Sequence, residues 1–397
     1  MASLQVQLPP AYSQHCETAV KPIYLDYNAS TPIAPEVAQA MRPFLSHHYG
    51  NPSSPHWAGA PARQAIEKAR GQVAQLLGCA PQEVIFTSGG TEANNHAIKG
   101  VFFSPRKKGN HIVTSQIEHP AVLQPCRFLE RLGAEVTYLP VDATGCVNPE
   151  DVRKSITPQT ILVSVMHANN EVGTIQSIAE IGRITRECGV FLHTDAAQSV
   201  GKIPTNVTEL GVDLLTVAGH KLYAPKGVGG LYVRQGVPLE ALMHGAGHEA
   251  GRRAGTENVL LDVGLGAACE LAAADLEPRR ARLAKLRDYF QSGLKDLFGD
   301  SLHLNGHPTE RLPNTLNVSF AGRLGTEVLE ALDGVAASTG SACHSGRREL
   351  SPVLKAMGVS ESIGLGAVRF SLGRWTTADE LDQILALFRS RILNHRP

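Results

Sequence analysis

The stretch VDLLTVAGHKLYAPKGVGGLYV, residues 212–233, is the part of the sequence from which the fold can be worked out. An apolar, β-prone run at 214–217 gives way to His220 and Lys221, and a second β-prone run follows at 231–233 after a proline and three glycines. This order predicts that Lys221 lies in a tight connection between two buried strands. An ammonium group loses several kcal/mol of hydration when it leaves water. Such a lysine is therefore either exposed on a Gly/Pro turn or used covalently, as in a Schiff base, which needs an amine of lowered pKa.

The chain from Val84 to Val233 alternates β-prone runs with helical ones. The β-prone runs are, in order, VIFTS, HIVTS, EVTYL, ILVSVMH, VFLHTD, DLLTVA and GGLYV, and helices are expected at 91–103, 120–132, 149–156 and 177–188. Two earlier helices are expected at about 35–45 and 60–77. Strands separated by helices predict an α/β fold with a mostly parallel sheet covered on both faces, whose ligands bind at the carboxyl ends of the strands.

Polar residues follow these runs at the predicted carboxyl ends. They are Gly89-Gly90-Thr91-Glu92, Glu118-His119, Asn169-Asn170-Glu171, and Asp195 with Gln198. A glycine turn that enters a helix can bind an anion, although it also occurs as simple turn chemistry, and a single His or Asn after a strand is usually an ordinary loop residue. Together with Lys221, however, an acid and an anion-binding helix terminus suit pyridoxal phosphate, which needs an amine, a carboxylate for its ring nitrogen and a phosphate site.

A smaller region follows a helical stretch at about 258–298. Its β-prone runs at 316–320 and 368–372 and its helical patterns at 327–332 and 377–393 predict helices on an antiparallel sheet. We expect three parts, namely an N-terminal segment at 1–30 that packs with the small domain, a large cofactor-binding domain at 31–265 and a small C-terminal domain at 266–397.

One cysteine of the small domain, Cys343, has a setting that favours reactivity. It lies in GSACHSGRR, residues 340–348, where glycines on both sides permit movement and His344 and two arginines favour the thiolate. The other six cysteines are interpreted as small core or surface residues.

Composition narrows the class of protein. A length of 397 residues favours two domains, and equal numbers of Lys+Arg and Asp+Glu, 37 each, give no support to nucleic-acid or anionic-membrane binding. The seven cysteines are scattered without a C-x-x-C pair, which indicates a reducing compartment. No signal peptide and no long apolar run is evident, so we expect a soluble, cytoplasmic protein.

The sequence resembles cysteine desulfurases and selenocysteine lyases, in the class V aminotransferase-like branch of the type I pyridoxal-phosphate enzymes. The resemblance runs from about Tyr24 to Leu387. It is carried, in family order, by YLDYNASTP, GNPSSPH, FTSGGTEANN, EH at 118, HANNEVG, HTDAAQSVGK, GHKLYAPKGVG, GTEN, LPNTLNVSF, GSACHS and VRFSLGR.

The resemblance implies a role for each matched residue. Lys221 would be the Schiff-base lysine, Asp195 the partner of the pyridinium nitrogen, and His119 the ring that stacks on the cofactor and assists proton transfers. Asn170 and Gln198 would address the ring hydroxyl and the substrate.

Further residues are implied for the phosphate and the substrate. Gly90, Thr91 and His220 would bind the phosphate, and Thr256, in GTEN, would reach the phosphate of the neighbouring subunit, which implies an obligate homodimer. Arg369 would clamp the substrate carboxylate and Cys343 would attack the substrate sulfur.

Two features of the sequence bear on these roles. Many desulfurases carry a serine two residues before the histidine that precedes the lysine, where this chain has Ala218, so one phosphate hydrogen bond is expected to be missing; selenocysteine lyases similarly lack the serine. The H-x-x-x-H spacing of His244 and His248 suggests a metal site, but three glycines up to Gly251 make the helix that such a site needs unfavourable, and we expect a loop and no metal.

The implied function is a pyridoxal 5'-phosphate-dependent cysteine desulfurase that forms alanine and a Cys343 persulfide and passes sulfur to an acceptor protein. The alternative within the family is a selenocysteine lyase, which Ala218 and the ACHS sequence favour. A non-catalytic scaffold for sulfur or Fe–S assembly partners is a rival, against which the intact Lys221, Asp195, Cys343 and Arg369 argue. A dinucleotide-binding protein is disfavoured because no G-x-G-x-x-G follows the first strand.

Overall fold

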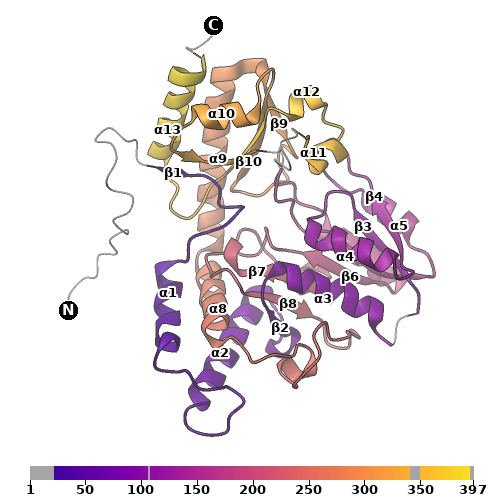
Figure 1. The fold of residues 1–397 in the computed structure, drawn as a ribbon. Helices are drawn as coiled ribbons and strands as arrows, with labels where there is room; N and C mark the ends of the chain where they lie inside the picture. The colour runs from indigo at the N-terminus through magenta and orange to yellow at the C-terminus, as the bar shows by residue number, and fades with distance from the viewer. Residues whose placement is uncertain (1–21, 106–107, 340–348, 394–397) are drawn as a thin grey trace, which may run out of the picture.

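The computed structural model describes residues 22–105, 108–339 and 349–393 (Figure 1). Two regions are stacked in this view, a larger one below and a smaller one above. The long helix α9 (Leu276–Phe298) extends from the larger region up into the smaller one. None of the helices in the described ranges is long and apolar enough to cross a membrane.

A seven-stranded sheet forms the centre of the larger region. Its strands are β2 (Val84–Thr87), β3 (His111–Ser115), β4 (Glu135–Leu139), β5 (Thr160–Ser164), β6 (Phe191–Asp195), β7 (Leu214–Ala218) and β8 (Gly229–Val233), in the order β2-β8-β7-β6-β5-β3-β4. Neighbours from β7 to β4 run parallel, whereas β8 runs antiparallel to both β2 and β7. The predicted mostly parallel sheet is confirmed, and the reversed β8 explains why a short connection, which holds Lys221, can join it to β7.

Helices cover both faces of this sheet, as its apolar strands require. The helices of this region are α1 (Pro35–Met41), α2 (Ala60–Leu77), α3 (Gly90–Phe103), α4 (Pro120–Glu130), α5 (Pro149–Ser155), α6 (Ile178–Cys188), α7 (Val207–Leu210) and α8 (Val259–Ala274). One apolar core includes side chains of α2, α6 and α8, and a second core on the opposite face includes those of α3 and α4. The expected helix at 35–45 is divided, because α1 ends at Met41 and a 3₁₀ turn follows over Arg42–Leu45, where Pro43 has no N–H to continue an α-helix.

The smaller region is built on a four-stranded antiparallel sheet. Its strands are β9 (Leu302–Asn305), β10 (Thr315–Phe320), β12 (Ser338–Thr339) and β13 (Ala367–Ser371), in the order β12-β13-β10-β9, and its helices are α10 (Gly325–Ala331), α11 (Pro352–Ala356), α12 (Glu361–Gly364) and α13 (Ala378–Leu387) together with α9. Four buried phenylalanines form much of the core, Phe290, Phe320 and Phe370 from these elements and Phe388 directly after α13. The predicted α+β arrangement is confirmed.

The N-terminal chain connects the two regions. Strand β1 (Ile23–Tyr24) pairs in parallel with β11 (Val335–Ala336), and Asp26 bridges to Ser371 of β13. The chain then crosses to α1 in the larger region (Figure 1). Residues 25–31 therefore lie where both regions meet, and the division at 1–30, 31–265 and 266–397 stays a prediction.

Candidate active site

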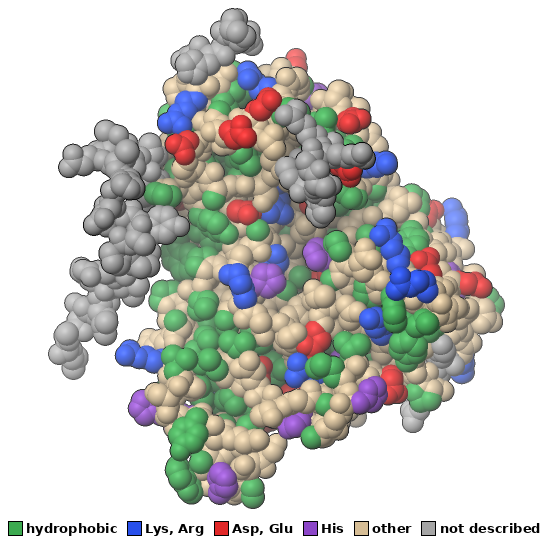
Figure 2. Space-filling view, viewed as in Figure 1, with side chains coloured by type: hydrophobic (Ala, Val, Ile, Leu, Met, Phe, Trp, Pro, Cys, Tyr) green, Lys and Arg blue, Asp and Glu red, His purple; other side chains and the backbone are tan. Residues whose placement is uncertain are grey.

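A cavity of about 620 Å³ opens at the carboxyl ends of the central strands. Histidine, lysine and arginine side chains gather between the two regions on the face shown in Figure 2. The cavity is lined by nine of the residues singled out from the sequence, namely Gly90, Thr91, His119, Asn170, Asp195, Gln198, His220, Lys221 and Arg369. Because β2 and β7 run in the same direction on either side of β8, the glycine turn and the lysine connection emerge at one edge of the sheet.

Lys221 lies in the 3₁₀ turn Gly219–Lys221 that follows β7. Its Nζ donates hydrogen bonds to the carbonyl oxygens of Asn28, at 2.6 Å, and Ala29, at 2.8 Å. Desolvation, and after it the positive charge of Arg369, lowers the pKa of Lys221 to about 8. A sizeable fraction of neutral, nucleophilic amine is therefore present near neutral pH.

Asp195 ends β6 and is buried. Its Oδ1 accepts from the backbone N–H of Ala197 at 2.9 Å, and its Oδ2 accepts from Asn94 Nδ2 at 2.6 Å. Asn94 is itself buried on α3, one turn after the helix begins, and was not assigned a role from the sequence. The same helix thus offers its N-terminus to an anion and fixes the carboxylate.

His119 is the N-cap of α4, and its Nδ1 accepts from the backbone N–H of Ala121 at 3.1 Å. The proton of the neutral ring is consequently on Nε2. Desolvation lowers the pKa of His119. The preceding residue, Glu118, is buried and joins two strand ends, because its Oε1 accepts from Ser115 Oγ at 2.6 Å and from the N–H of Met166 at 2.9 Å.

The N-terminus of α3 opens on the cavity at the turn that follows β2. Gly89 has a φ of 149°, and a Cβ on Gly229 of the adjacent strand would lie only 2.7 Å from the carbonyl carbon of Gly89, so glycine is required for this close approach. The side chain of Thr91, at the start of α3, is exposed to the cavity. His220 lines the same cavity, and its partial burial lowers its pKa to about 4. Ala218, 2% exposed, lines the same wall with no hydroxyl to donate.

Arg369, on β13, is a side chain of the smaller region that lines the cavity. Its Nη2 donates to Asp26 Oδ1 at 2.7 Å and to Ser338 Oγ at 3.0 Å, and its Nη1 donates to the carbonyl oxygen of Asn170 at 3.0 Å. Its Nε is buried and has no partner among the described residues. Three of the five guanidinium N–H donors are thus used within the described part of the protein, and one N–H of Nη1 and the N–H of Nε are not. Asp26 was missed from the sequence, although it lies in the YLDYNASTP motif.

Asn28 was also missed, and it links several of these residues. It is 1% exposed, and its carbonyl oxygen accepts from Lys221 Nζ and, at 3.0 Å, from Gln198 Nε2. Its Nδ2 donates to Thr315 Oγ1 at 2.8 Å and to the carbonyl oxygen of Asn170 at 3.2 Å. Only its place in a quoted motif could have indicated this, since a buried Asn has no distinguishing pattern in one sequence.

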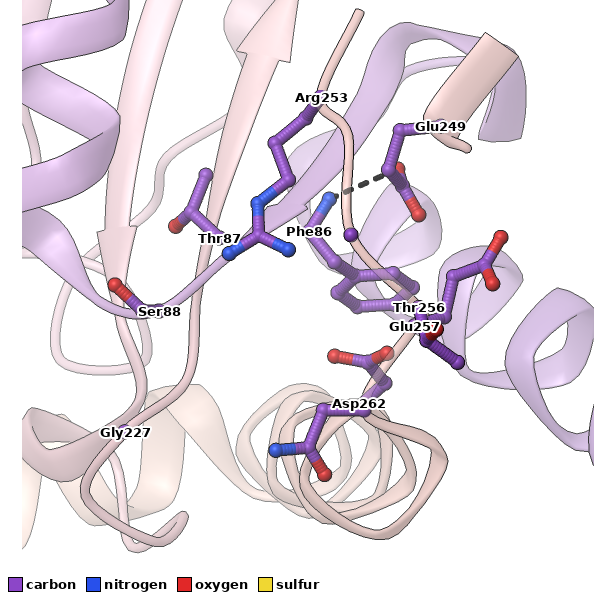
Figure 3. A pocket seen from close by; sticks show the side chains of 11 residues that line it. Phe86, Thr87, Ser88, Gly227, Glu249, Arg253, Thr256, Glu257 and Asp262 are labelled. Carbon is purple, nitrogen blue, oxygen red and sulfur yellow. Dashed lines mark hydrogen bonds between the residues drawn. The ribbon is translucent and has the colours of Figure 1, made fainter. Parts of the chain in front are cut away.

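Thr256 does not line the main cavity. It lines a neighbouring pocket of about 190 Å³, which shares Ser88 and Gly227 with the cavity (Figure 3). Arg253 of the same loop pairs with Glu92 of α3 at 2.8 Å, and Glu249 accepts from the N–H of Phe86, the contact dashed in Figure 3. Cys343 lies outside the described residues.

The two histidines considered as metal ligands lie in irregular structure before the short 3₁₀ turn Glu249–Gly251. His244 Nε2 is 3.2 Å from Glu240 Oε1, and His248 Nε2 is 4.0 Å from Glu257 Oε2.

The side chains of the main cavity fit pyridoxal phosphate. They supply an amine of lowered pKa, a buried carboxylate held by two donors, and a helix N-terminus beside a hydroxyl for the phosphate. Arg369 also lines this cavity, and its guanidinium can bind an anionic group.

Comparison with known proteins gives one consistent family. Residues 23–384 match the aminotransferase class-V family. The chain is 51% identical over 365 residues to the cysteine desulfurase IscS of Dictyoglomus turgidum, covering 91% of this chain and 92% of that protein. It is 49% identical over 374 residues to the cysteine desulfurase IscS of Methanosarcina thermophila, covering 94% of this chain and 92% of that protein.

Solved structures agree with the sequence relatives. A NifS-like protein superposes with a TM-score of 0.88 at 40% identity, over 94% of this chain and all of that chain. The protein SspA, solved in complex with cysteine, superposes with a TM-score of 0.78 at 38% identity, over 89% of this chain and all of that chain.

Proposed function

The chain belongs to the cysteine desulfurases of the aminotransferase class-V family, and from this premise we propose that it converts L-cysteine to L-alanine with pyridoxal 5'-phosphate and transfers the sulfur to Cys343. Members of this family depend on that cofactor. The observation that carries the proposal for this chain is the amine of Lys221, which is desolvated and lies in one cavity with Asp195 and Arg369.

The residues that would hold the cofactor follow from the cavity. Lys221 would anchor it covalently, Asp195 would pair with its ring nitrogen and His119 would stack on the ring. Gly90, Thr91 and His220 would bind the phosphate, and Asn170 and Gln198 would address the ring hydroxyl. When bound, the cofactor supplies the electron sink that acidifies the α-proton of an amino acid.

The chain's own groups account for the remaining steps. Arg369 binds the substrate carboxylate through its fork of donors, and Lys221 takes the α-proton and later returns a proton to the carbon skeleton. The Cys343 thiolate forms a bond to the substrate sulfur while the Cβ–S bond breaks. The electron pair of that bond stays on carbon and is protonated, so the products are alanine and a Cys343 persulfide.

The test of the Lys221 assignment is Lys221→Ala. With pyridoxal phosphate and L-cysteine, the variant should form no alanine above the buffer rate, because no other residue in the motif can anchor the cofactor and move the α-proton. The exposed Lys285→Ala on α9 is the matched control and should turn over like the wild type. Appreciable alanine from Lys221→Ala would contradict the proposal.

The role of Cys343 is tested separately by Cys343→Ala, with the exposed Cys188→Ala as its control. The Cys343 variant should still change its cofactor absorption on addition of L-cysteine, yet release no sulfide with reductant present and carry no persulfide by mass spectrometry. Full sulfide release from this variant would exclude the mechanism as written.

L-Selenocysteine is the second substrate to be tested. Ala218 stands where many desulfurases have a serine that would donate to the phosphate, and selenocysteine lyases similarly lack this serine. Alanine formation from L-cysteine and L-selenocysteine should be measured in parallel, and we expect both to be used. Residual selenium release by Cys343→Ala, without sulfide release, would favour the lyase reaction.

The proposal includes a homodimer with shared sites, a sulfur-acceptor protein and a cytoplasmic location. Two features support the dimer. Thr256 lies in a pocket beside the main cavity rather than in it, and large apolar side chains are exposed in and after the 3₁₀ turn that follows α1, Leu45 (69%), Tyr49 (77%) and Trp57 (82%). Figure 2 shows hydrophobic side chains at the lower end of the molecule, where this loop lies.

A further inference from the structure

We propose that Lys202 is a positioning residue that fixes the amide of Gln198, so that its NH₂ group, and not its carbonyl, is available to the ring oxygen of the cofactor. Lys202 lies one turn after Gln198, in the turns that follow β6. The inference rests on the proposed function, because it concerns how the same cavity holds pyridoxal phosphate.

The contacts of Lys202 are with two amide oxygens. Its Nζ donates to Gln198 Oε1 at 2.7 Å and to Asn28 Oδ1 at 3.1 Å. Within the described residues no carboxylate pairs with it, and the charged groups that face it are Lys221 and Arg369. Burial and these two cations lower its pKa, which means that the chain places an amine where an ammonium is costly.

A lysine in this place decides the orientation of both amides. An ammonium has three donors and no acceptor, and a neutral amine has two donors and one lone pair; here the nitrogen donates to both amide oxygens. The atom of Gln198 that faces Lys202 is therefore Oε1 as long as Lys202 donates, and Nε2 is turned to the opposite side, where it donates to the carbonyl oxygen of Asn28 at 3.0 Å. Lys221 donates to the same carbonyl oxygen at 2.6 Å, so Nε2 is held beside the anchoring amine.

Lys202 orients the side-chain amide of Asn28 in the same way. Its Oδ1 accepts from Lys202 and also from Asn314 Nδ2 at 3.0 Å, which turns its Nδ2 towards Thr315 Oγ1. Without Lys202, only the carbonyl oxygen of Asn28 would oppose a 180° turn of the Gln198 amide, which would exchange donor for acceptor.

The consequence concerns the ring oxygen of the cofactor, which is an acceptor when ionised. An NH₂ group stabilises that oxygen, whereas an amide carbonyl in its place would repel it. The net value of one such hydrogen bond corresponds to roughly a threefold to tenfold change in affinity. Lys202 would thus act on the cofactor through Gln198 without touching it.

The experiment is a double-mutant cycle of Lys202→Met and Gln198→Ala in the full-length protein. The methionine side chain is similar in length and has no donor. The readouts are the dissociation constant of pyridoxal phosphate and the pH dependence of the visible absorption of the loaded protein. Each single change should weaken binding threefold to tenfold and raise the apparent pKa of the absorption change, and the double variant should be no weaker than the weaker of the two single variants.

Three comparisons decide the result. Lys202→Arg, whose guanidinium only donates, should retain the wild-type spectrum, and Lys285→Met on the exposed face of α9 should change nothing. Thermal unfolding of each variant shows whether a loss of affinity is a loss of fold. Wild-type affinity and spectrum in Lys202→Met, or effects of the two single changes that multiply, would overturn this inference alone, whereas a wild-type protein that takes up no cofactor would overturn the proposed function with it.

Discussion

At the scale of single residues, the surroundings of Lys221 set its reactivity. Desolvation and Arg369 hold its pKa near 8, against the opposing charges of Asp26 and Asp195. Only the neutral amine attacks an aldehyde, so the rate at which the cofactor-free protein captures pyridoxal phosphate should rise with pH and level off above about 8. Stopped-flow absorption between pH 6 and 10 would measure this rate.

Pyridoxal phosphate itself titrates in the same pH range. The rate of its reaction with Nα-acetyl-lysine must therefore be measured alongside, as the reference with which the protein's rate is compared at each pH. That free amine should continue to gain rate up to about pH 10.4, the ordinary value for lysine. A protein rate that rises in parallel with it through pH 9 to 10 would show that the amine is not perturbed.

Asp26 is expected to orient Arg369, which we propose binds the substrate carboxylate. Its carboxylate holds Arg369 Nη2 at 2.7 Å, where the Arg369 side chain is 10% exposed. Asp26→Asn removes the charge from this contact, and the KM for L-cysteine should rise about fivefold with a smaller change in kcat. The exposed Asp333→Asn is the control. A lower KM in Asp26→Asn would mean instead that Asp26 competes with the substrate carboxylate.

At the scale of elements, Glu118 joins the end of β3 to the residues after β5. Burial raises the pKa of Glu118 to about 8, far above its value in the unfolded chain. Between about pH 4.5 and 8 the folded state therefore binds one more proton than the unfolded state, and stability falls as pH rises. Glu118→Gln should remove this fall.

Urea unfolding of the cofactor-free protein at pH 5 and pH 8 tests this expectation. The difference in unfolding free energy between Glu118→Gln and wild type should shift in favour of the variant by on the order of 2 to 4 kcal/mol from pH 5 to pH 8. The exposed Glu361→Gln should show no shift. Parallel pH profiles for Glu118→Gln and wild type would contradict it.

A second element, the loop that carries Thr256, is fixed to α2 by a buried ion pair and to the edge strand β2 by a hydrogen bond. Glu249 Oε2 lies 2.7 Å from Arg70 Nη1 of α2 and accepts from the N–H of Phe86, and the side chains of the pair are 2% and 10% exposed. Arg70→Met leaves the carboxylate unpaired and should cost about 3–5 kcal/mol of stability. Arg70→Met with Glu249→Met should recover most of this in urea unfolding, and a double variant less stable than Arg70→Met would contradict the assignment.

The elements were predictable from the sequence where a periodic pattern spans a whole strand or helix, as in HIVTS or the helix at 91–103. The residues that join elements were not. Asn28, Asn94 and Lys202 act through contacts across 100 or more positions of the chain or across a turn, and their residue types have no pattern of their own. Lys221 was found because its flanking strands and glycines restrict where it can lie.

At the scale of the whole molecule, the sharing of sites between two subunits can be tested through Thr256. We expect Thr256→Val to weaken cofactor binding at the partner's site. A mixed dimer of one Lys221→Ala subunit and one Thr256→Val subunit would then contain one site with both defects and one intact site. Since only a site with Lys221 gives the visible band, the intact site alone would be observed.

The cofactor affinity measured by that band distinguishes the two arrangements. Shared sites predict wild-type affinity in the mixed dimer, at half the occupancy, whereas sites built within one subunit predict the weaker affinity of the Thr256→Val homodimer. A mixed dimer of wild type with Lys221→Ala should have wild-type affinity under both arrangements, and it calibrates the band. Affinity in the test dimer no better than in Thr256→Val would place Thr256 in the site of its own subunit, and the pocket it shares with Ser88 and Gly227 would then be an extension of the main cavity.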